Sequence, residues 1–268
     1  MAQTLVRAKR KIKDAGIAYR IPDPHAWPQR LSSVLAVIYL IFNPGYSASS
    51  ASVSIRYELS DEAIRLGRML RELTPQEAET SGLLALMLLH DSRRVSRLSP
   101  AGEMLTLEHQ DRARWDLTKI NEGLSMPQLL DDSAKKMRSS AMGSYQLQAR
   151  ISAVHAEAIN FADTDWLSIA RLYDQLYCLN PSPVVRINNA VAIAYAHGAE
   201  LGLRVLPPLA SDPTLQDYQP YHAARAELLR QSGLVEAAID AYQTALRLST
   251  NSSERDCLSN RLKLLESV

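Results

Sequence analysis

The chain has 268 residues, of which 46% are hydrophobic, and its formal net charge is only +1. This composition excludes a disordered or low-complexity chain and predicts one elongated globular domain or two compact ones. The longest apolar run, Val34 to Phe42, is about half of the roughly 20 residues that a membrane helix needs, so we expect a cytoplasmic protein without membrane contact. The two cysteines stand apart in helical patterns and predict no disulfide.

The charge is unevenly distributed along the chain. Residues 1–20 hold six basic groups against Asp14 alone, a balance of +5, whereas the rest has 30 − 6 = 24 basic and 29 − 1 = 28 acidic groups, a balance of −4. Any nucleic-acid contact is therefore expected at the amino end. Residues 2–15 have the spacing of a helix, and a solvated basic surface is the simplest interpretation of its charges.

The opening residues, MAQTLVRAKRKIKDAG, resemble the end of the recognition helix in promoter-binding region 4 of sigma-70-type factors of the extracytoplasmic-function group. In that group the helix enters the major groove. The resemblance implies that, in a complete factor, two polar residues face base edges and the basic residues contact phosphates: Gln3, Thr4, Arg7, Lys9, Arg10, Lys11 and Lys13. The polymerase-binding region 2 would precede Met1, so we expect the carboxy-terminal part of such a factor.

Residues 21–28, IPDPHAWP, contain three prolines and predict a linker between the basic helix and a helical domain at 29–142. The first helix of this domain is expected at Arg30–Phe42, in the centre of the core, and is followed by a loop at 43–52. A second helix is expected to begin at Ser60, and Thr74, Pro75 and Glu77 form a predicted capping signal for a third helix.

The remainder of this domain is expected to be helical from Gln110, with Trp115, Leu117 and Ile120 buried and Gly123 as a stop. A polar-faced helix is predicted at 125–142. Seven charged residues lie in or beside these helices: Asp91, Arg93, Arg94, Asp111, Arg112, Arg114 and Asp116. No nucleophile or base accompanies them at a catalytic spacing, which favours a structural ion-pair network over an enzyme site.

Four blocks of this domain carry a second resemblance: LAVIYLIFNPGYSASS, EAIRLGRML, LLALMLLHDSRR and LEHQDRARWDLTKI. They are similar to the helical domain that follows region 4 in the subgroup of these sigma factors with a tetratricopeptide (TPR) extension. Pro44 departs from the acidic residue expected before Gly45 and Tyr46, so no role is assigned to a charge in that loop.

From residue 143 the sequence becomes repetitive. Thr164, Gly198 and Gly233 are expected at equivalent turns, with separations of 34 and 35 residues. Residues 219–251 resemble the TPR helix-turn-helix unit, through small residues such as Ala226 and larger ones such as Tyr242. The fold class predicted is all-α: helical hairpins leading into a TPR-like α-solenoid of three repeats, closed by a capping helix at 253–265. The prolines at 207 and 208 predict a short second helix in the middle repeat.

The concave surface of such an array would be lined by polar residues of the first helices: Asn188, Asn189, Tyr195, Glu227, Arg230 and Gln231. Solvated positions are one interpretation of these residues, and a groove for a protein or peptide partner is the other. Scattered histidines, and the absence of phosphate-loop and nucleophile-elbow motifs, lead us to expect no metal, no cofactor, no small-molecule substrate and no enzyme activity.

The leading hypothesis is transcription regulation. The chain would be the carboxy-terminal regulatory extension of an alternative sigma factor, with RNA polymerase core and promoter DNA as partners of the complete factor. Tethering through the short 21–28 linker would give the extension a high effective concentration near the promoter-reading region. The alternative is a free-standing TPR adaptor with a merely solvated basic terminus, and a third hypothesis is an enzyme that uses the charged residues between Asp91 and Asp116.

Overall fold

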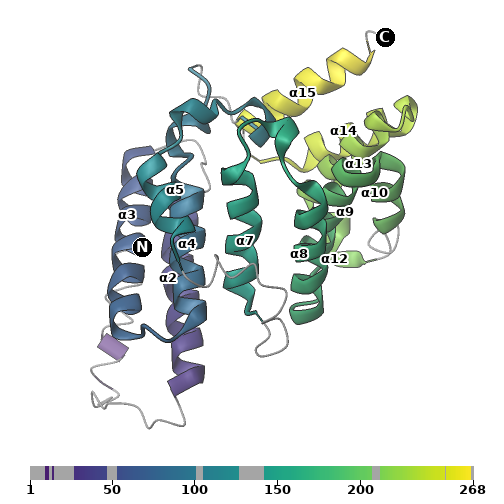
Figure 1. Cartoon of the computed structure of the whole chain (residues 1–268). Helices are drawn as coiled ribbons and strands as arrows, with labels where there is room; N and C mark the ends of the chain where they lie inside the picture. Colours follow the sequence, from purple (N-terminus) through teal and green to yellow (C-terminus); the bar gives the residue numbers. More distant parts are fainter. Residues whose placement is uncertain are drawn as a thin grey trace. The chain divides into compact units, whose positions relative to one another are not determined.

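A computed structural model describes residues 10–11, 14, 27–46, 53–100, 105–126, 142–206, 212–250 and 252–266. Within these ranges the protein consists of twelve α-helices and four short 3-10 helices, without a β-strand, so the predicted all-α class is confirmed (Figure 1). The chain divides into two compact units, 1–37 and 38–268. None of the described helices is long and apolar enough to cross a membrane.

Helix α2 (Trp27–Tyr46) is longer than the sequence predicted. It begins within the expected linker and continues through Pro44, because a proline so close to the helix end removes only one hydrogen bond of the last turn. Leu35 and Phe42 are buried, as the spacing predicted, but Val37 and Leu40 are 54% and 66% exposed. The prediction that α2 is central to the core was therefore wrong for this side of the helix.

Helix α3 (Val53–Leu73) also begins earlier than predicted. Ser60 lies inside this helix and is fully buried, so the prediction that it starts the helix was wrong. Thr74 was likewise misplaced: its hydroxyl donates to the Leu70 carbonyl oxygen at 2.7 Å and closes α3, instead of capping the next helix. The sequence rule failed because a threonine can bond backward to the helix it ends as well as forward.

Helix α4 (Ala78–Asp91) is buried along almost its whole length, since it packs against α3, α5 (Leu117–Leu124) and α7 (Ser144–Glu157). A Cβ atom on Gly82 would lie 2.7 Å from the Gln146 backbone nitrogen, so only glycine permits this approach of α4 to α7. The Glu79 carboxylate accepts hydrogen bonds from the backbone N–H groups of Tyr145 and Gln146 at 3.1 and 3.0 Å. A carboxylate of α4 thus caps the start of α7.

The segment before α5 is less helical than predicted. Three 3-10 turns, η2 (Arg94–Ser96), η3 (Leu107–His109) and η4 (Arg112–Arg114), precede it, and α5 itself begins only at Leu117. Trp115 and Ile120 are buried as expected. Leu117 is 68% exposed, and Gly123 lies inside α5 against Leu89 instead of stopping the helix, so both of those predictions were wrong. Most of the helix predicted at 125–142 lies outside the described residues.

The carboxy-terminal part is a succession of hairpins in which each helix packs on its neighbours in the chain (Figure 1). After α7 and the turn η5 (Phe161–Asp163), the helices are α8 (Trp166–Leu179), α9 (Pro183–His197), α10 (Ala199–Val205), α12 (Pro213–Gln216), α13 (Gln219–Gln231), α14 (Val235–Leu248) and α15 (Ser252–Glu266). Gly198 and Gly233 have φ values of +101° and +74°, which only glycine adopts readily, and they form the predicted hairpin turns.

Three apolar clusters run through these hairpins, each shared by consecutive ones. The first joins α7, α8 and α9 around Leu147 and Ile169, the second joins α9, α12 and α13 around Leu215 and Leu228, and the third joins α13, α14 and α15 around Tyr242. Because no hairpin buries its apolar face alone, the stability of each depends on its neighbours. Helix α10 ends at Val205, in agreement with the short second helix predicted for the middle unit.

Candidate functional site

Only part of the predicted DNA-binding helix can be placed. Arg10 and Lys11 are described, helical and exposed, and the Arg10 Nε atom lies 3.7 Å from an Asp14 carboxylate oxygen. Gln3, Thr4, Arg7, Lys9 and Lys13 lie outside the described residues. Promoter contact by this helix therefore stays a prediction.

The two adjacent asparagines of α9 lie in different environments. Asn188 is exposed, but Asn189 is completely buried. The Asn189 amide group donates hydrogen bonds to the Ala170 carbonyl oxygen at 3.0 Å and to Asp174 Oδ1 at 3.2 Å, both on α8. The prediction that Asn189 lines a groove was wrong, because adjacent helical residues point about 100° apart and only one of the pair can face solvent.

Tyr195, also on α9, belongs to an aromatic cluster with Phe161 and Trp166. The rings of Trp166 and Tyr195 are stacked, with centroids 4.3 Å apart and an interplanar angle of 17°. Phe161 meets both rings edge-on at 5.3 Å. Tyr195 is 37% exposed, so part of its ring faces solvent. Its packing against Phe161 and Trp166 fixes the orientation of that exposed edge between two hairpins.

The three predicted residues of α13 form one polar cluster around the Glu227 carboxylate. Arg230 Nη2 and Gln231 Nε2 donate to Glu227 Oε1 at 2.6 and 2.9 Å. The other carboxylate oxygen accepts from the Tyr242 hydroxyl of α14 at 2.6 Å and from Arg261 Nη1 of α15 at 3.1 Å. Glu227 therefore connects α13, α14 and α15 through its hydrogen bonds, rather than standing in solvent as a groove residue.

Burial and hydrogen bonding shift the pKa values of several residues in and beside this cluster. Burial alone would raise the pKa of Glu227, but hydrogen bonds from Arg230, Tyr242 and Gln231 lower that pKa to about 2. Burial and the Glu227 carboxylate raise the pKa of Tyr242 to about 12. Burial also raises the pKa of Tyr195, while a hydrogen bond with Gln231 opposes that rise. Tyr195 thus lies beside the Glu227 cluster, which joins the surfaces of α9 and α13.

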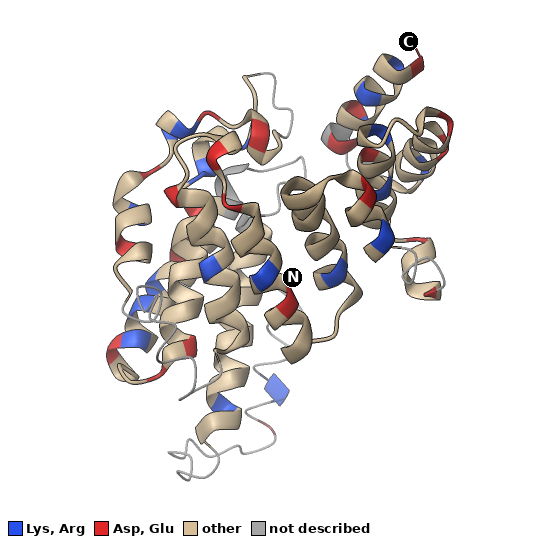
Figure 2. Ribbon diagram, turned by 45° about the vertical axis from the view of Figure 1, so that its right-hand side comes forward, with Lys and Arg blue, Asp and Glu red and all other residues tan. Residues whose placement is uncertain are grey.

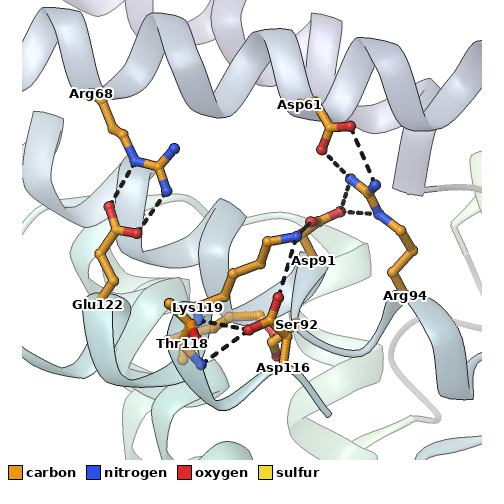
Figure 3. A network of polar contacts seen from close by, with 10 residues as sticks. Asp61, Arg68, Asp91, Ser92, Arg94, Asp116, Thr118, Lys119 and Glu122 are labelled. Atoms are coloured by element: carbon orange, nitrogen blue, oxygen red, sulfur yellow. Dashed lines mark hydrogen bonds and ion pairs between the residues drawn. The ribbon is translucent and has the colours of Figure 1, made fainter. Parts of the chain in front are cut away.

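A second polar network connects α3, α4 and α5 (Figure 3). Its centre is Asp91, whose side chain is only 5% exposed. Arg94 Nε donates to Asp91 Oδ1 at 2.9 Å, and Lys119 Nζ donates to Asp91 Oδ2 at 2.6 Å. Arg94 also contacts Asp61 of α3 at 2.6 Å, and Asp116 lies 3.7 Å from Lys119. Both Asp91 oxygens are engaged by cations, which supports a structural role for this carboxylate.

The other charged residues of that predicted set lie elsewhere. Asp111 accepts from the Ala113 backbone N–H group at 3.0 Å and caps η4, and Arg114 is exposed. Arg93 and Arg112 lie against the Trp115 ring, with guanidinium carbons 5.9 and 4.7 Å from its centroid. Of the seven residues, Asp91, Arg94 and Asp116 belong to the Asp91 network, and Arg93 and Arg112 belong to a separate cluster at Trp115. Asp111 and Arg114 belong to neither group.

Several residues of these clusters were missed by sequence analysis. Lys119 and Asp61 complete the Asp91 network, and a bidentate pair of Arg68 with Glu122 ties α3 to α5 at 2.8 and 2.6 Å. Two pairs of this network, Asp91 with Arg94 and Asp116 with Lys119, are three residues apart and carried a local signal of pairing. Asp61 and Arg94 are 33 positions apart, so no spacing rule could have joined them.

The potential metal ligands and the two thiols are dispersed over the described part of the chain. Among the described residues no three His, Cys, Asp or Glu side chains are grouped as metal ligands would be. Cys178 is exposed and Cys257 is partly buried, and both are free thiols. Figure 2 shows acidic and basic residues interspersed over the described helices.

Comparison with known proteins gives a family match and a relative. Residues 30–130 match a family of unknown function, DUF6596. The whole chain is similar to an uncharacterized protein of Rhizobium meliloti (strain 1021), at 42% identity over 254 residues. This similarity covers 95% of the chain but only 58% of the relative, so the chain spans less than two thirds of that protein. No solved structure matches significantly.

Proposed function

We propose that this chain is the carboxy-terminal regulatory extension of an extracytoplasmic-function-type sigma factor, and that it acts through protein contacts. The observation that carries the proposal is the recurrence of helix hairpins at α7–α8, α9–α10 and α13–α14, whose turns are 34 and 35 residues apart. That period and packing favour a TPR-like solenoid, an architecture that presents first helices to protein partners. The greater length of the Rhizobium meliloti relative is compatible with further sigma-factor regions.

The proposed contact surface consists of exposed residues on the first helices of two hairpins. Tyr195 contributes an aromatic edge, Asn188 an exposed amide, Gln231 a polar group that hydrogen-bonds Tyr195, and Arg230 an exposed guanidinium on the same helix as Gln231. Aromatic and arginine side chains are the residue types that most often carry the binding energy of protein interfaces. Glu227 would orient Arg230 and Gln231 without itself contacting the partner.

In the complete factor, the amino-terminal residues from Gln3 to Lys13 would contact the promoter, and the extension would stay close to them through the 21–28 segment. Holding the extension near the promoter-reading region raises its effective concentration there. A coupling of typical size, 1–3 kcal/mol, would change the occupancy of the active state by about 5- to 150-fold. Regulation by contact within one chain is therefore energetically sufficient.

The test is promoter-dependent transcription in vitro with RNA polymerase core and the complete factor. We expect the double variant Asn188→Ala/Tyr195→Ala to change transcript yield about fivefold or more, because it removes the exposed groups of α9. Asn121→Ala, an exposed asparagine of α5, is the matched control and should leave the yield unchanged. Unchanged transcription with the double variant would contradict the proposed surface.

A free-standing adaptor is the alternative function. It is favoured by the division of the chain into two compact units, because the hairpins belong to the unit 38–268 and the basic amino-terminal residues to the unit 1–37. The adaptor predicts no binding to RNA polymerase core and no effect on transcription. Co-purification of the complete protein with the core enzyme separates the two functions, since only the sigma-factor proposal requires that complex.

A further inference from the structure

The cluster at Trp115 contains polar groups that neither the fold nor the proposed function explains. Trp115 is 5% exposed and follows η4, between Arg112 and the start of α5. Arg112 Nη1 donates to the carbonyl oxygens of His155 and Ala158, at 2.5 and 2.7 Å. Arg112 thus places a cation at the carboxy end of α7, where the helix dipole is negative.

Three buried nitrogen atoms in this cluster have no hydrogen-bond partner among the described residues. They are Arg112 Nη2, Trp115 Nε1 and His155 Nδ1. Arginine and indole nitrogens can only donate, and the imidazole nitrogen can donate in the appropriate tautomer. Buried polar atoms are nearly always hydrogen-bonded in folded proteins, so three such atoms in one cluster indicate an absent acceptor.

The charges of the cluster have the same sign. Burial and the nearby Arg93 lower the pKa of Arg112, and burial with Arg93 and Arg112 lowers the pKa of His155 to about 3. Asp163 opposes the shift at Arg112, but it is exposed and its carboxylate accepts hydrogen bonds from Asn160. No described carboxylate lies within ion-pair distance of Arg112, so its charge, which is partly buried, has no ionic partner among the described residues.

We propose that Arg112, Trp115 and His155 bind a small oxyanion, namely the carboxylate or phosphate group of a soluble ligand. The free Arg112 nitrogen supplies a charge-assisted donor, the kind that carboxylates and phosphates bind most strongly. The indole N–H and the imidazole Nδ1–H complete a set of three donors from η4, the following turn and α7. Binding would connect the segment before α5 to the first hairpin of the repetitive part.

Thermal unfolding of the full chain tests the proposal. Inorganic phosphate and acetate are the probes, each titrated at constant ionic strength against chloride. We expect one of them to raise the Tm by about 5 °C at 100 times its Kd, and the shift should grow with the logarithm of the anion concentration above that Kd. The same shift at a lower concentration of phosphate than of acetate identifies a phosphate site, and the reverse order identifies a carboxylate site.

Three variants give the result its specificity. Arg112→Gln removes the charge, and Trp115→Phe keeps an aromatic ring in the core but removes the indole donor together with one of the two fused rings. Both should lose at least half of the Tm shift. Arg114→Gln is the matched control, because it removes an exposed charge from the same 3-10 turn and should keep the full shift.

Two results would overturn the inference. One is equal Tm values in phosphate, acetate and chloride for the wild-type chain. The other is a full anion-dependent shift in Trp115→Phe, which is the decisive variant if Arg112→Gln does not fold. Neither result bears on the proposed regulatory function, which rests on the surface of α9 and α13.

Discussion

Asp91, which is buried, and Glu227, which is partly buried, are two carboxylates that each connect three helices, but they do so with different chemistry. Asp91 is held by two cations, Arg94 and Lys119, and Arg94 extends the network to α3. Glu227 accepts hydrogen bonds from two arginines and also from neutral donors, Gln231 and the Tyr242 hydroxyl.

The difference lies in what remains when a carboxylate loses its charge. Without the Asp91 charge, two partly buried cations face each other across a neutral side chain. Without the Glu227 charge, an amide at the same position still accepts from Tyr242, and Arg230 can turn toward solvent because it is exposed. We therefore expect the Asp91 network to depend on charge more strongly than the Glu227 cluster, in which neutral donors supply part of the hydrogen bonding.

The largest effect is expected from Asp91→Asn. Breaking a buried pair leaves uncompensated charge, so we expect a loss of about 3 kcal/mol in the free energy of unfolding, measured by urea denaturation. Asp240→Asn, at an exposed position of α14, is the control and should cost under about 0.5 kcal/mol. If Asp91→Asn loses no more unfolding free energy than Asp240→Asn, the charge of Asp91 does not stabilise the amino-terminal hairpins.

A pH titration separates the regions further. The pKa of His155 is about 3 when folded, mainly because of burial, and burial also lowers the pKa of His90. Between about pH 6.5 and 3 the unfolded imidazole binds a proton that the folded one does not, so stability falls as pH falls, by up to about 1.4 kcal/mol per pH unit for each histidine.

His155→Gln tests this titration. The variant should roughly halve the slope of unfolding free energy against pH between pH 6.5 and 5, because His90 still titrates. His197→Gln, at an exposed position at the end of α9, is the control and should keep the wild-type slope. An unchanged slope in His155→Gln would mean that the folded chain protonates this imidazole normally.

Glu227→Gln should cost less than Asp91→Asn, about 2 kcal/mol at neutral pH, because the site is partly solvated. Since the pKa of Glu227 falls to about 2, its stabilisation is present above about pH 4.5 and is lost as pH falls toward 2. Denaturation at pH 7 and pH 3 should show a smaller penalty for the variant at the lower pH. Glu236→Gln, exposed on the same hairpin, should show no such dependence.

The smallest effect is expected for the partly exposed pair of Arg68 with Glu122. A double-mutant cycle with Arg68→Ala and Glu122→Ala should give a coupling of about 0.5 kcal/mol, because water screens both partners. Raising the salt concentration should reduce that coupling further. A coupling energy as large as the loss of unfolding free energy in Asp91→Asn would mean that the exposed Arg68–Glu122 pair and the buried Asp91 network stabilise the amino-terminal hairpins equally.

The hairpin turns show what could be predicted locally. Gly198 and Gly233 have positive φ, a conformation that one residue type strongly favours, so their spacing revealed the period. The shortness of α10 was equally local, because the two prolines that follow Leu206 cannot continue a helix. Within the candidate surface, the positions of Glu227, Arg230 and Gln231 on one helix followed from the same period.

Other features depended on contacts between distant segments. The direction of Asn189, the exposure of Leu117 and the partners of Asp91 are decided by which helix packs against which. Thr74 and Ser60 were misread because a capping pattern does not say whether a helix has already begun upstream.

The sequence by itself determined the all-α class, the hairpin period and the places where helices turn, because backbone conformation at glycine and proline is a local property. Tertiary structure decided which polar residues face solvent and which are paired inside. It also brought Arg112 and Trp115 together with His155, which is 43 positions from Arg112. Burial and charge pairing are properties of the packed helices, and a sequence pattern cannot reveal them until the packing is known.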